Sequence, residues 1–131
     1  IEPQYIKQFI TETFKPAFWA SQGIKVHYSP VTGEWRVEGK SAVGTNDVNA
    51  YSTYGIQRMN AYKILENTLN LRDVRIYDKV VDTDGTERRV LNTKETTLAQ
   101  QKQQVIKDAF KDWLQAGVRR WWPNTMSCST A

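Results

Sequence analysis

Aromatic and basic residues occur together between positions 51 and 89, and these are the residue types that bind nucleic acid. Aromatic rings stack on bases, while Arg and Lys side chains pair with phosphate oxygens. The residues fall into two groups, one around the start of an expected helix and one on an expected β-hairpin. The first group is Tyr51, Tyr54, Arg58 and Lys63, and the second group is Arg72, Arg75, Lys79, Arg88 and Arg89.

Both groups also have a purely structural interpretation. Tyr51 and Tyr54 can be half-buried packing residues, because a tyrosine ring is apolar apart from its hydroxyl. Asp73, Asp78 and Glu87 dilute the charge of the second group, as is typical of a solvated surface. Two hypotheses therefore stand side by side: these residues bind DNA weakly and without sequence preference, or they only pack and solvate the surface.

Three other motifs do not meet the requirements of a binding site. Gly33–Ser41 resembles a phosphate-binding loop, but five residues separate its glycines where the loop requires four. Asp82 and Asp84 fit a tight turn, because the further ligands of a calcium loop are missing. His27 is the single histidine and lacks a pattern of metal ligands around it. The sequence predicts no catalytic residue, no metal and no cofactor.

The periodicity of apolar residues predicts the elements that carry these groups. Helical spacing covers about 3–15, resumes near 57 and returns from Thr93, where Asn92 can cap the last helix. Alternation predicts one β-hairpin over 24–38 and a second over 74–91. The expected fold is a single α+β domain. Its two hairpins are expected to form one mainly antiparallel sheet, packed with three principal helices.

The last helix is expected to pack through a continuous apolar stripe. Its opposite face is rich in Gln and Lys, which also suits a connector helix that runs into a neighbouring domain. The stripe consists of Leu98, Val105, Ile106, Ala109, Phe110, Trp113 and Leu114.

Length and composition describe an ordinary soluble domain. The chain has 131 residues, of which 40% are hydrophobic and 24% charged, and this excludes global disorder. No apolar run approaches the ~20 residues of a membrane span, and no signal-peptide pattern is present. A single cysteine gives no support for secretion, so a cytoplasmic location is expected. The net charge of +4 is weak evidence for a nucleic-acid partner.

Three stretches of this sequence resemble one protein family. They are EPQYIKQFITETF, HYSPVTGEWRVEGK and the long segment Asn49–Leu114. They are similar to the large helicase and adenine-methylase proteins of bacterial conjugative elements and phages, in which a methylase-like region precedes a Swi/Snf-type helicase. The resemblance covers residues 2–114 and implies an accessory segment of a DNA-processing protein from a mobile genetic element. The chain lacks the methylase motif and the helicase phosphate-binding loop, so it should not be an enzyme.

The sequence departs from this family after Leu114. Family members continue with a stretch similar to LVxxYNxxFNS, whereas residues 121–131 read WWPNTMSCSTA. If the codon boundary is moved back one nucleotide, the codons allowed for this peptide can encode LVAQYNVLFNS. We therefore expect residues 115–131 to be an out-of-frame tail of a truncated protein; the alternative is an independent natural tail. Trp121, Trp122 and Cys128 are then not family residues, although the two tryptophans could dock a second copy and form a homodimer.

The expected function is that of a non-catalytic accessory or linker domain. It would position or couple the helicase and methylase domains of its parent protein on DNA. The alternative is a stand-alone module that binds nucleic acid weakly and without sequence preference. No membrane partner is expected.

Overall fold

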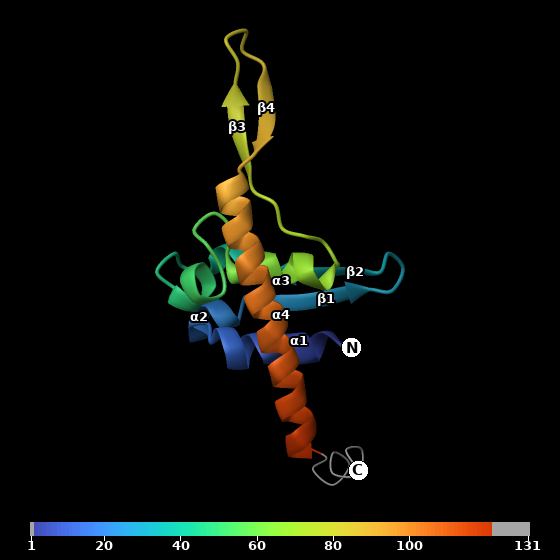
Figure 1. The fold of residues 1–131 in the computed structure, drawn as a ribbon. Helices are drawn as coiled ribbons and strands as arrows, with labels where there is room; N and C mark the ends of the chain where they lie inside the picture. Colours follow the sequence, from blue (N-terminus) through green and yellow to red (C-terminus); the bar gives the residue numbers. More distant parts are fainter. Residues whose placement is uncertain (1, 122–131) are drawn as a thin grey trace, which may run out of the picture.

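The computed structural model describes residues 2–121, and its side chains are described as far as Gly117. It confirms the α+β class, the predicted order of helices and hairpins, and the start of the last helix at Thr93 (Figure 1). The helical elements are α1 (Pro3–Phe9), η1 (Ile10–Phe14), α2 (Phe18–Ser21), η2 (Lys40–Ala42), η3 (Asn49–Thr53), α3 (Ala61–Leu69) and α4 (Thr93–Trp121). The strands are β1 (Lys25–Ser29), β2 (Glu34–Glu38), β3 (Tyr77–Val81) and β4 (Glu87–Leu91).

The two hairpins form separate two-stranded sheets, so the prediction of one joint sheet is wrong. β1 pairs with β2 and β3 pairs with β4, both in antiparallel register. β1 and β2 lie in the body with α1 and α3, whereas β3 and β4 project beyond the body from the N-terminal end of α4 (Figure 1). Among the described residues, helix side chains form hydrogen bonds with the backbone of β2 and of the segment before β3. A joint sheet would need strands at these two positions.

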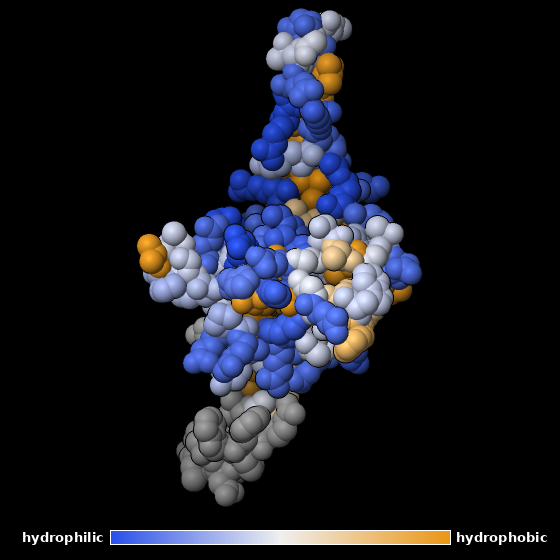
Figure 2. All heavy atoms as spheres, turned by 180° about the vertical axis from the view of Figure 1, so that it is seen from behind, coloured by the Kyte–Doolittle hydropathy of each residue, from blue (hydrophilic) through white to orange (hydrophobic). Residues whose placement is uncertain are grey.

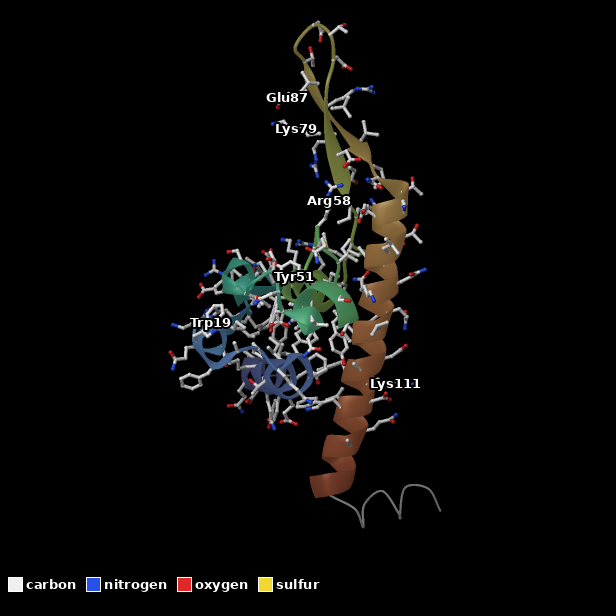
Figure 3. All side chains as sticks on the ribbon, turned by 90° about the vertical axis from the view of Figure 1, so that its left-hand side faces the viewer. Trp19, Tyr51, Arg58, Lys79, Glu87 and Lys111 are labelled. Carbon is white, nitrogen blue, oxygen red and sulfur yellow. The ribbon has the colours of Figure 1, made fainter. Side chains whose placement is uncertain are left out.

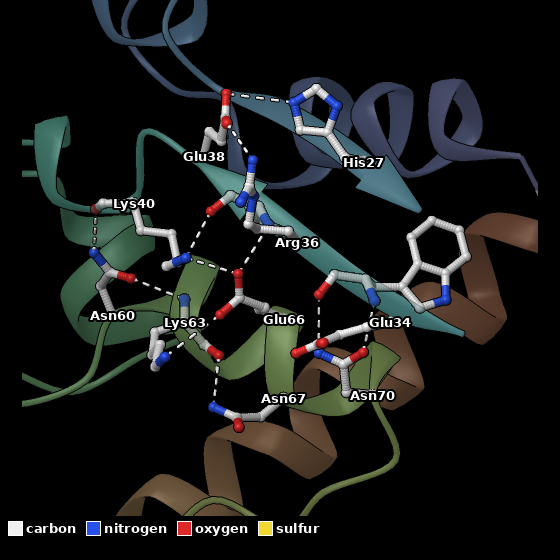
Figure 4. Close-up of polar contacts among 12 residues, drawn as sticks. His27, Glu34, Arg36, Glu38, Lys40, Asn60, Lys63, Glu66, Asn67 and Asn70 are labelled. Atoms are coloured by element: carbon white, nitrogen blue, oxygen red, sulfur yellow. Dashed lines mark hydrogen bonds and ion pairs between the residues drawn. The ribbon is translucent and has the colours of Figure 1, made fainter. Parts of the chain in front are cut away.

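Side chains of α3 bind the outer edge of β2 (Figure 4). Asn70 Oδ1 accepts a hydrogen bond from Trp35 N (2.7 Å), and Asn70 Nδ2 donates one to Trp35 O (3.0 Å). One turn earlier on α3, Glu66 Oε2 accepts from Val37 N (2.8 Å). The fit follows from geometry, because residues four apart share a helix face and alternate residues of a strand direct their backbone groups to the same edge. The helix thereby covers a strand edge that would otherwise be open.

The extended segment before β3 is held by α4 in a similar way. Thr96 Oγ1 accepts from Ile76 N (2.9 Å). Gln103 Oε1 accepts from Val74 N (3.3 Å), and Gln103 Nε2 donates to Arg72 O (2.8 Å). Thr96 and Gln103 are seven positions apart, so both side chains lie on the same face of α4. These contacts fix the direction in which the chain enters β3.

The buried face of α4 therefore differs from the predicted apolar stripe. Leu98, Val105 and Leu114 are 38%, 40% and 39% exposed, so these three stripe residues do not belong to the core. Two polar side chains take part in the inner face because the backbone before β3 supplies their hydrogen-bond partners. The inner face consists of Thr96, Ala99, Gln103, Ile106, Ala109, Phe110 and Trp113.

An aromatic cluster fixes the middle of α4 on the body. Phe9 is fully buried, and its ring centroid lies 5.0 Å from that of Phe110 and 5.7 Å from that of Trp113 in edge-to-face geometry. Phe14 joins the cluster 5.5 Å from Phe9 and meets Tyr62 of α3 at 5.3 Å. Each such ring contributes roughly 1.5–3 kcal/mol by burial, and edge-to-face contact adds to this. The cluster unites α1, η1, α3 and α4.

The ends of the helices follow local sequence signals. The first helical stretch ends at Phe14, and Lys15 turns the chain with a φ of 50° before Pro16. α3 begins at Ala61 rather than near 57, because Asn60 is its N-cap and accepts a hydrogen bond from Lys63 N (3.1 Å). The predicted start near 57 is thus too early.

Candidate nucleic-acid interface

An open groove lies at the base of the β3–β4 hairpin, where the hairpin meets the body. Its volume is 680 Å³, and it brings together five of the nine predicted nucleic-acid residues. They come from the loop before α3, the segment before β3 and the hairpin itself, and Figure 3 shows Arg58 below Lys79 and Glu87. The residues that line the groove are Arg58, Met59, Arg75, Ile76, Tyr77, Asp78, Lys79, Glu87, Arg88 and Arg89.

Arg58 ties the body to the hairpin. Its Nη1 lies 2.5 Å from Asp78 Oδ1, and its Nη2 donates to Tyr77 O (2.9 Å). Asp78 Oδ2 accepts in turn from Asn92 Nδ2 (2.9 Å), while Asn92 Oδ1 caps α4 by accepting from Glu95 N (3.0 Å). The predicted Asn92 cap is confirmed. The Arg58 side chain is still 40% exposed, so it can present further N–H groups to a ligand in the groove.

Two further cations of the groove are held in exposed ion pairs. Lys79 Nζ lies 3.1 Å from Glu87 Oε2, and Arg88 Nε lies 3.3 Å from Asp82 Oδ1. Exposed pairs of this kind contribute at most about 1 kcal/mol. Exchange of either carboxylate for a phosphate oxygen would therefore cost little.

Arg89 and Arg75 have no carboxylate within ion-pair distance among the described residues. The Arg89 guanidinium instead lies over the ring of Tyr77, 4.4 Å from the ring centroid. The side chain of Arg75 is exposed at the rim of the groove. These two charges are not neutralised locally and dominate the positive field of the groove.

The structure places the other four predicted residues outside the groove. Lys63 forms an ion pair with Glu66 on its own helix (3.4 Å), and Arg72 lies 3.5 Å from Glu34 on β2. Both cations are exposed, but neither lines the groove.

Tyr51 and Tyr54 belong to the body (Figure 3 labels Tyr51). The Tyr51 hydroxyl accepts a hydrogen bond from Asn60 Nδ2 (3.3 Å), and the Tyr54 ring lies 5.1 Å from that of Phe14. Both are half-buried and pack against the core, which favours the structural interpretation of these two tyrosines.

Three apolar or aromatic residues of the groove, Met59, Ile76 and Tyr77, are not among the predicted nucleic-acid residues. Tyr77 begins β3, and the register places its partner Leu91 two residues from Arg89, so the two side chains lie diagonally on one face. The proximity of Tyr77 and Arg89 could therefore have been predicted from the sequence by assuming this hairpin register. Met59 has no comparable signal, because an isolated bridge between Ile56 and Met59 turns the chain just before α3.

The most enclosed ion pair outside the groove is structural. The Glu66 side chain is 12% exposed, and Lys40 Nζ lies 2.7 Å from its Oε2. Burial alone would raise the pKa of Glu66, but the hydrogen bonds from Lys40 and Val37, together with the charges of Lys40 and Lys63, hold that pKa below its ordinary value. This carboxylate is therefore a charged partner of the β2 edge.

The weaker motifs of the sequence have ordinary structural roles. Gly85 turns the second hairpin with a φ of 86°, as predicted, and Asp84 accepts a hydrogen bond from Thr86 N (2.9 Å). His27 is an exposed strand residue 3.3 Å from Glu38. Among residues 2–121, no group of three His, Cys, Asp or Glu side chains could hold a metal ion, and no helix is long and apolar enough to cross a membrane. Trp122 and Cys128 lie outside the described residues, as does the side chain of Trp121.

Comparison with known proteins gives one family. The family described as a domain of unknown function (DUF8437) matches residues 1–120. No curated protein and no solved structure matches this chain.

Proposed function

This chain belongs to the DUF8437 family, and we propose that it is a non-catalytic accessory domain that contacts nucleic acid through the groove at the base of the β3–β4 hairpin. The composition of the groove carries the proposal. Five cations and two carboxylates line it, and in the described part of the chain two of the cations, Arg75 and Arg89, have no carboxylate within ion-pair distance. Phosphate groups are the ligands that such a surface attracts.

The connection between the hairpin and α4 supports a positioning role. Only Asn92 separates the end of β4 from the start of α4, and its side chain binds both Asp78 and the first turn of the helix. α4 has 29 residues and is therefore roughly 43 Å long at 1.5 Å per residue. A ligand held in the groove would thus be held at a defined angle to a long helix that passes across the body (Figure 1).

The resemblance of residues 2–114 to mobile-element helicase and adenine-methylase proteins supports the same proposal. Under it, the ligand is DNA, the compartment is the cytoplasm, and the partners are the helicase and methylase domains of a parent protein. The task of this domain would be to position or couple those domains on DNA.

Binding of fluorescently labelled 20-nucleotide DNA, measured by anisotropy at 50 and 200 mM salt, tests the proposal. About three phosphate contacts should lower the affinity roughly 20- to 40-fold over this salt range. The double substitution Arg88→Glu/Arg89→Glu should weaken binding at least tenfold for every sequence tested, because it removes two cations and adds two carboxylates.

The matched control is Lys107→Glu/Lys111→Glu, which changes the net charge equally at exposed positions of α4 away from the groove (Figure 3 labels Lys111). Equal losses in both double variants would show that only overall charge matters. No binding by the unmodified protein at 50 mM salt would refute the proposal itself.

A further inference from the structure

The floor of the groove differs chemically from its rim. The half-buried Met59 and Tyr77 and the buried Ile76 supply its apolar and aromatic lining, whereas its Arg and Lys residues are exposed. Figure 2 shows this contrast at the neck between hairpin and body, where apolar atoms lie between strongly hydrophilic residues on both sides. A surface that binds only a phosphate backbone does not require an apolar floor, but an unstacked base does.

The charge of the hairpin changes along its length. The cations Lys79, Arg88 and Arg89 lie on its two strands, whereas the turn residues 82–86 contain Asp82 and Asp84 and no cation. A two-stranded ribbon that enters the major groove of a duplex places its tip between two rows of phosphates. The two carboxylates at the tip oppose that arrangement, so the ligand should cross the base of the hairpin rather than surround its tip.

Arg89 and Tyr77 supply a stacking surface at that base. The guanidinium lies 4.4 Å from the centroid of the Tyr77 ring, and Arg89 is an exposed residue. Guanidinium planes stack on unpaired bases, and a ring underneath holds the plane in position. In a duplex the faces of the bases are covered by their neighbours, so only an unpaired strand can use this surface.

We infer that the groove selects single-stranded nucleic acid, with one base stacked on the Arg89 guanidinium above Tyr77 and the adjacent phosphates paired with Arg58, Arg75 and Lys79. This inference rests on the proposed function and specifies the form of its ligand. Stacking and phosphate pairing are common to DNA and RNA, so a dT20 and a rU20 probe are both used to identify the source.

The experiment compares dT20, rU20 and a 20-base-pair duplex in anisotropy titrations at 100 mM salt. A purely electrostatic groove would bind the duplex at least as tightly, because the duplex has the higher charge density. Selection by stacking predicts at least fivefold tighter binding of a single strand. Arg89→Lys keeps the charge and removes the planar group, so it should weaken single-strand binding roughly 5- to 20-fold and leave duplex binding within twofold.

The control is Arg72→Lys, the same substitution at an exposed arginine that pairs with Glu34 and does not line the groove. It should change binding of either probe less than twofold. Tyr77→Leu should reproduce the effect of Arg89→Lys if the ring orients the guanidinium, and circular dichroism confirms that both variants are folded.

Each result separates this inference from the proposal on which it rests. Tighter binding of the duplex, or equal losses with Arg89→Lys and Arg72→Lys, would overturn single-strand selection and leave nucleic-acid contact standing. Failure of all three probes to bind, even at 50 mM salt, would remove both. Tighter binding of dT20 than of rU20, or the reverse, identifies the ligand as DNA or RNA. Either result supports the inference when Arg89→Lys abolishes the advantage of that single strand over the duplex.

Discussion

Asn70 bonds to both backbone polar groups of Trp35, accepting from its N–H at 2.7 Å and donating to its C=O at 3.0 Å. One amide side chain thus supplies the two hydrogen bonds that a neighbouring strand would make. With Glu66 at Val37, it completes the edge of β2 without a third strand. This explains why a domain with two hairpins contains no four-stranded sheet among its described residues.

The substitution Asn70→Ala should destabilise the fold. It leaves the N–H and C=O of Trp35 without partners in a partly buried position, which costs about 1–3 kcal/mol. The control is Asn67→Ala, which removes only a hydrogen bond to Lys63 O on the same helix and should be neutral or slightly stabilising. Thermal unfolding measures both, and equal midpoints for the two variants would contradict a special role for Asn70.

Gln103 has the corresponding role on α4. Gln103→Leu preserves volume but leaves Val74 N–H and Arg72 C=O unpaired, so we expect a loss of about 2–3 kcal/mol in urea unfolding. Gln104→Leu, one position along, removes only an exposed contact with Asp108 and should cost less than about 0.5 kcal/mol. Hydrogen exchange at the Val74 amide should also accelerate in Gln103→Leu alone. If the two variants unfold at the same urea concentration, the hydrogen bonds of Gln103 to Val74 and Arg72 do not stabilise the fold.

The contacts of Asn70 and Gln103 show how far sequence patterns can predict this fold. The class, the order of elements and the capping by Asn92 were predictable because they depend on local spacing. Thr96 and Gln103 were not expected on the buried face of α4, since periodicity places polar residues outside unless their partners are known. Those partners are backbone groups about 20 to 31 positions earlier in the chain. The joint sheet was mispredicted for the same reason.

The candidate site was predictable by residue type and only in part by position. Arg58, Arg75 and Lys79 were identified from charge alone, and the fold brings them to one groove. Tyr51 and Tyr54 are equally typical of a nucleic-acid site by residue type, but both pack on the core, Tyr54 against Phe14 and Tyr51 with its hydroxyl bound to Asn60. Spacing along the chain cannot show which aromatic ring will find a buried partner.

Stability should depend on the ionisation of Glu66. Its pKa is lowered in the folded protein from an ordinary value of 4.5, because the bonds and charges of Lys40, Val37 and Lys63 outweigh burial. The folded state therefore binds this proton less readily than the unfolded state. The resulting stabilisation is present above about pH 4.5 and is lost as the pH falls through the lower, folded-state pKa.

The variant Glu66→Gln isolates this effect from that of other carboxylates. The difference in unfolding midpoint between the unmodified protein and Glu66→Gln should be largest near pH 6–7 and should shrink below about pH 4. The matched control is Glu87→Gln, at an exposed ion pair with Lys79, which should lower the unfolding midpoint at pH 7 less than Glu66→Gln does. A Glu66→Gln difference that stays constant from pH 3 to pH 7 would contradict the assignment.

We also expect no catalytic turnover. The isolated protein should neither hydrolyse ATP nor transfer methyl groups to DNA, because the sequence lacks the helicase phosphate-binding loop and the methylase motif. Phosphate release and incorporation of labelled methyl groups measure the two activities. Turnover that follows the protein through successive purification steps would contradict the non-catalytic proposal.

The final prediction concerns the segment after Leu114. α4 passes the body near Trp113, whose Nε1 donates to Glu12 Oε1 at 3.2 Å, and Gln115 and Ala116 are exposed. A chain that ends at Leu114 keeps the aromatic cluster of Phe9, Phe110 and Trp113, so its free energy of unfolding should change by no more than about 1 kcal/mol. A larger loss in urea unfolding would assign residues 115–131 a structural role. Size-exclusion chromatography of both chains provides the second readout, because a dimer formed through Trp121 and Trp122 should dissociate when these residues are removed.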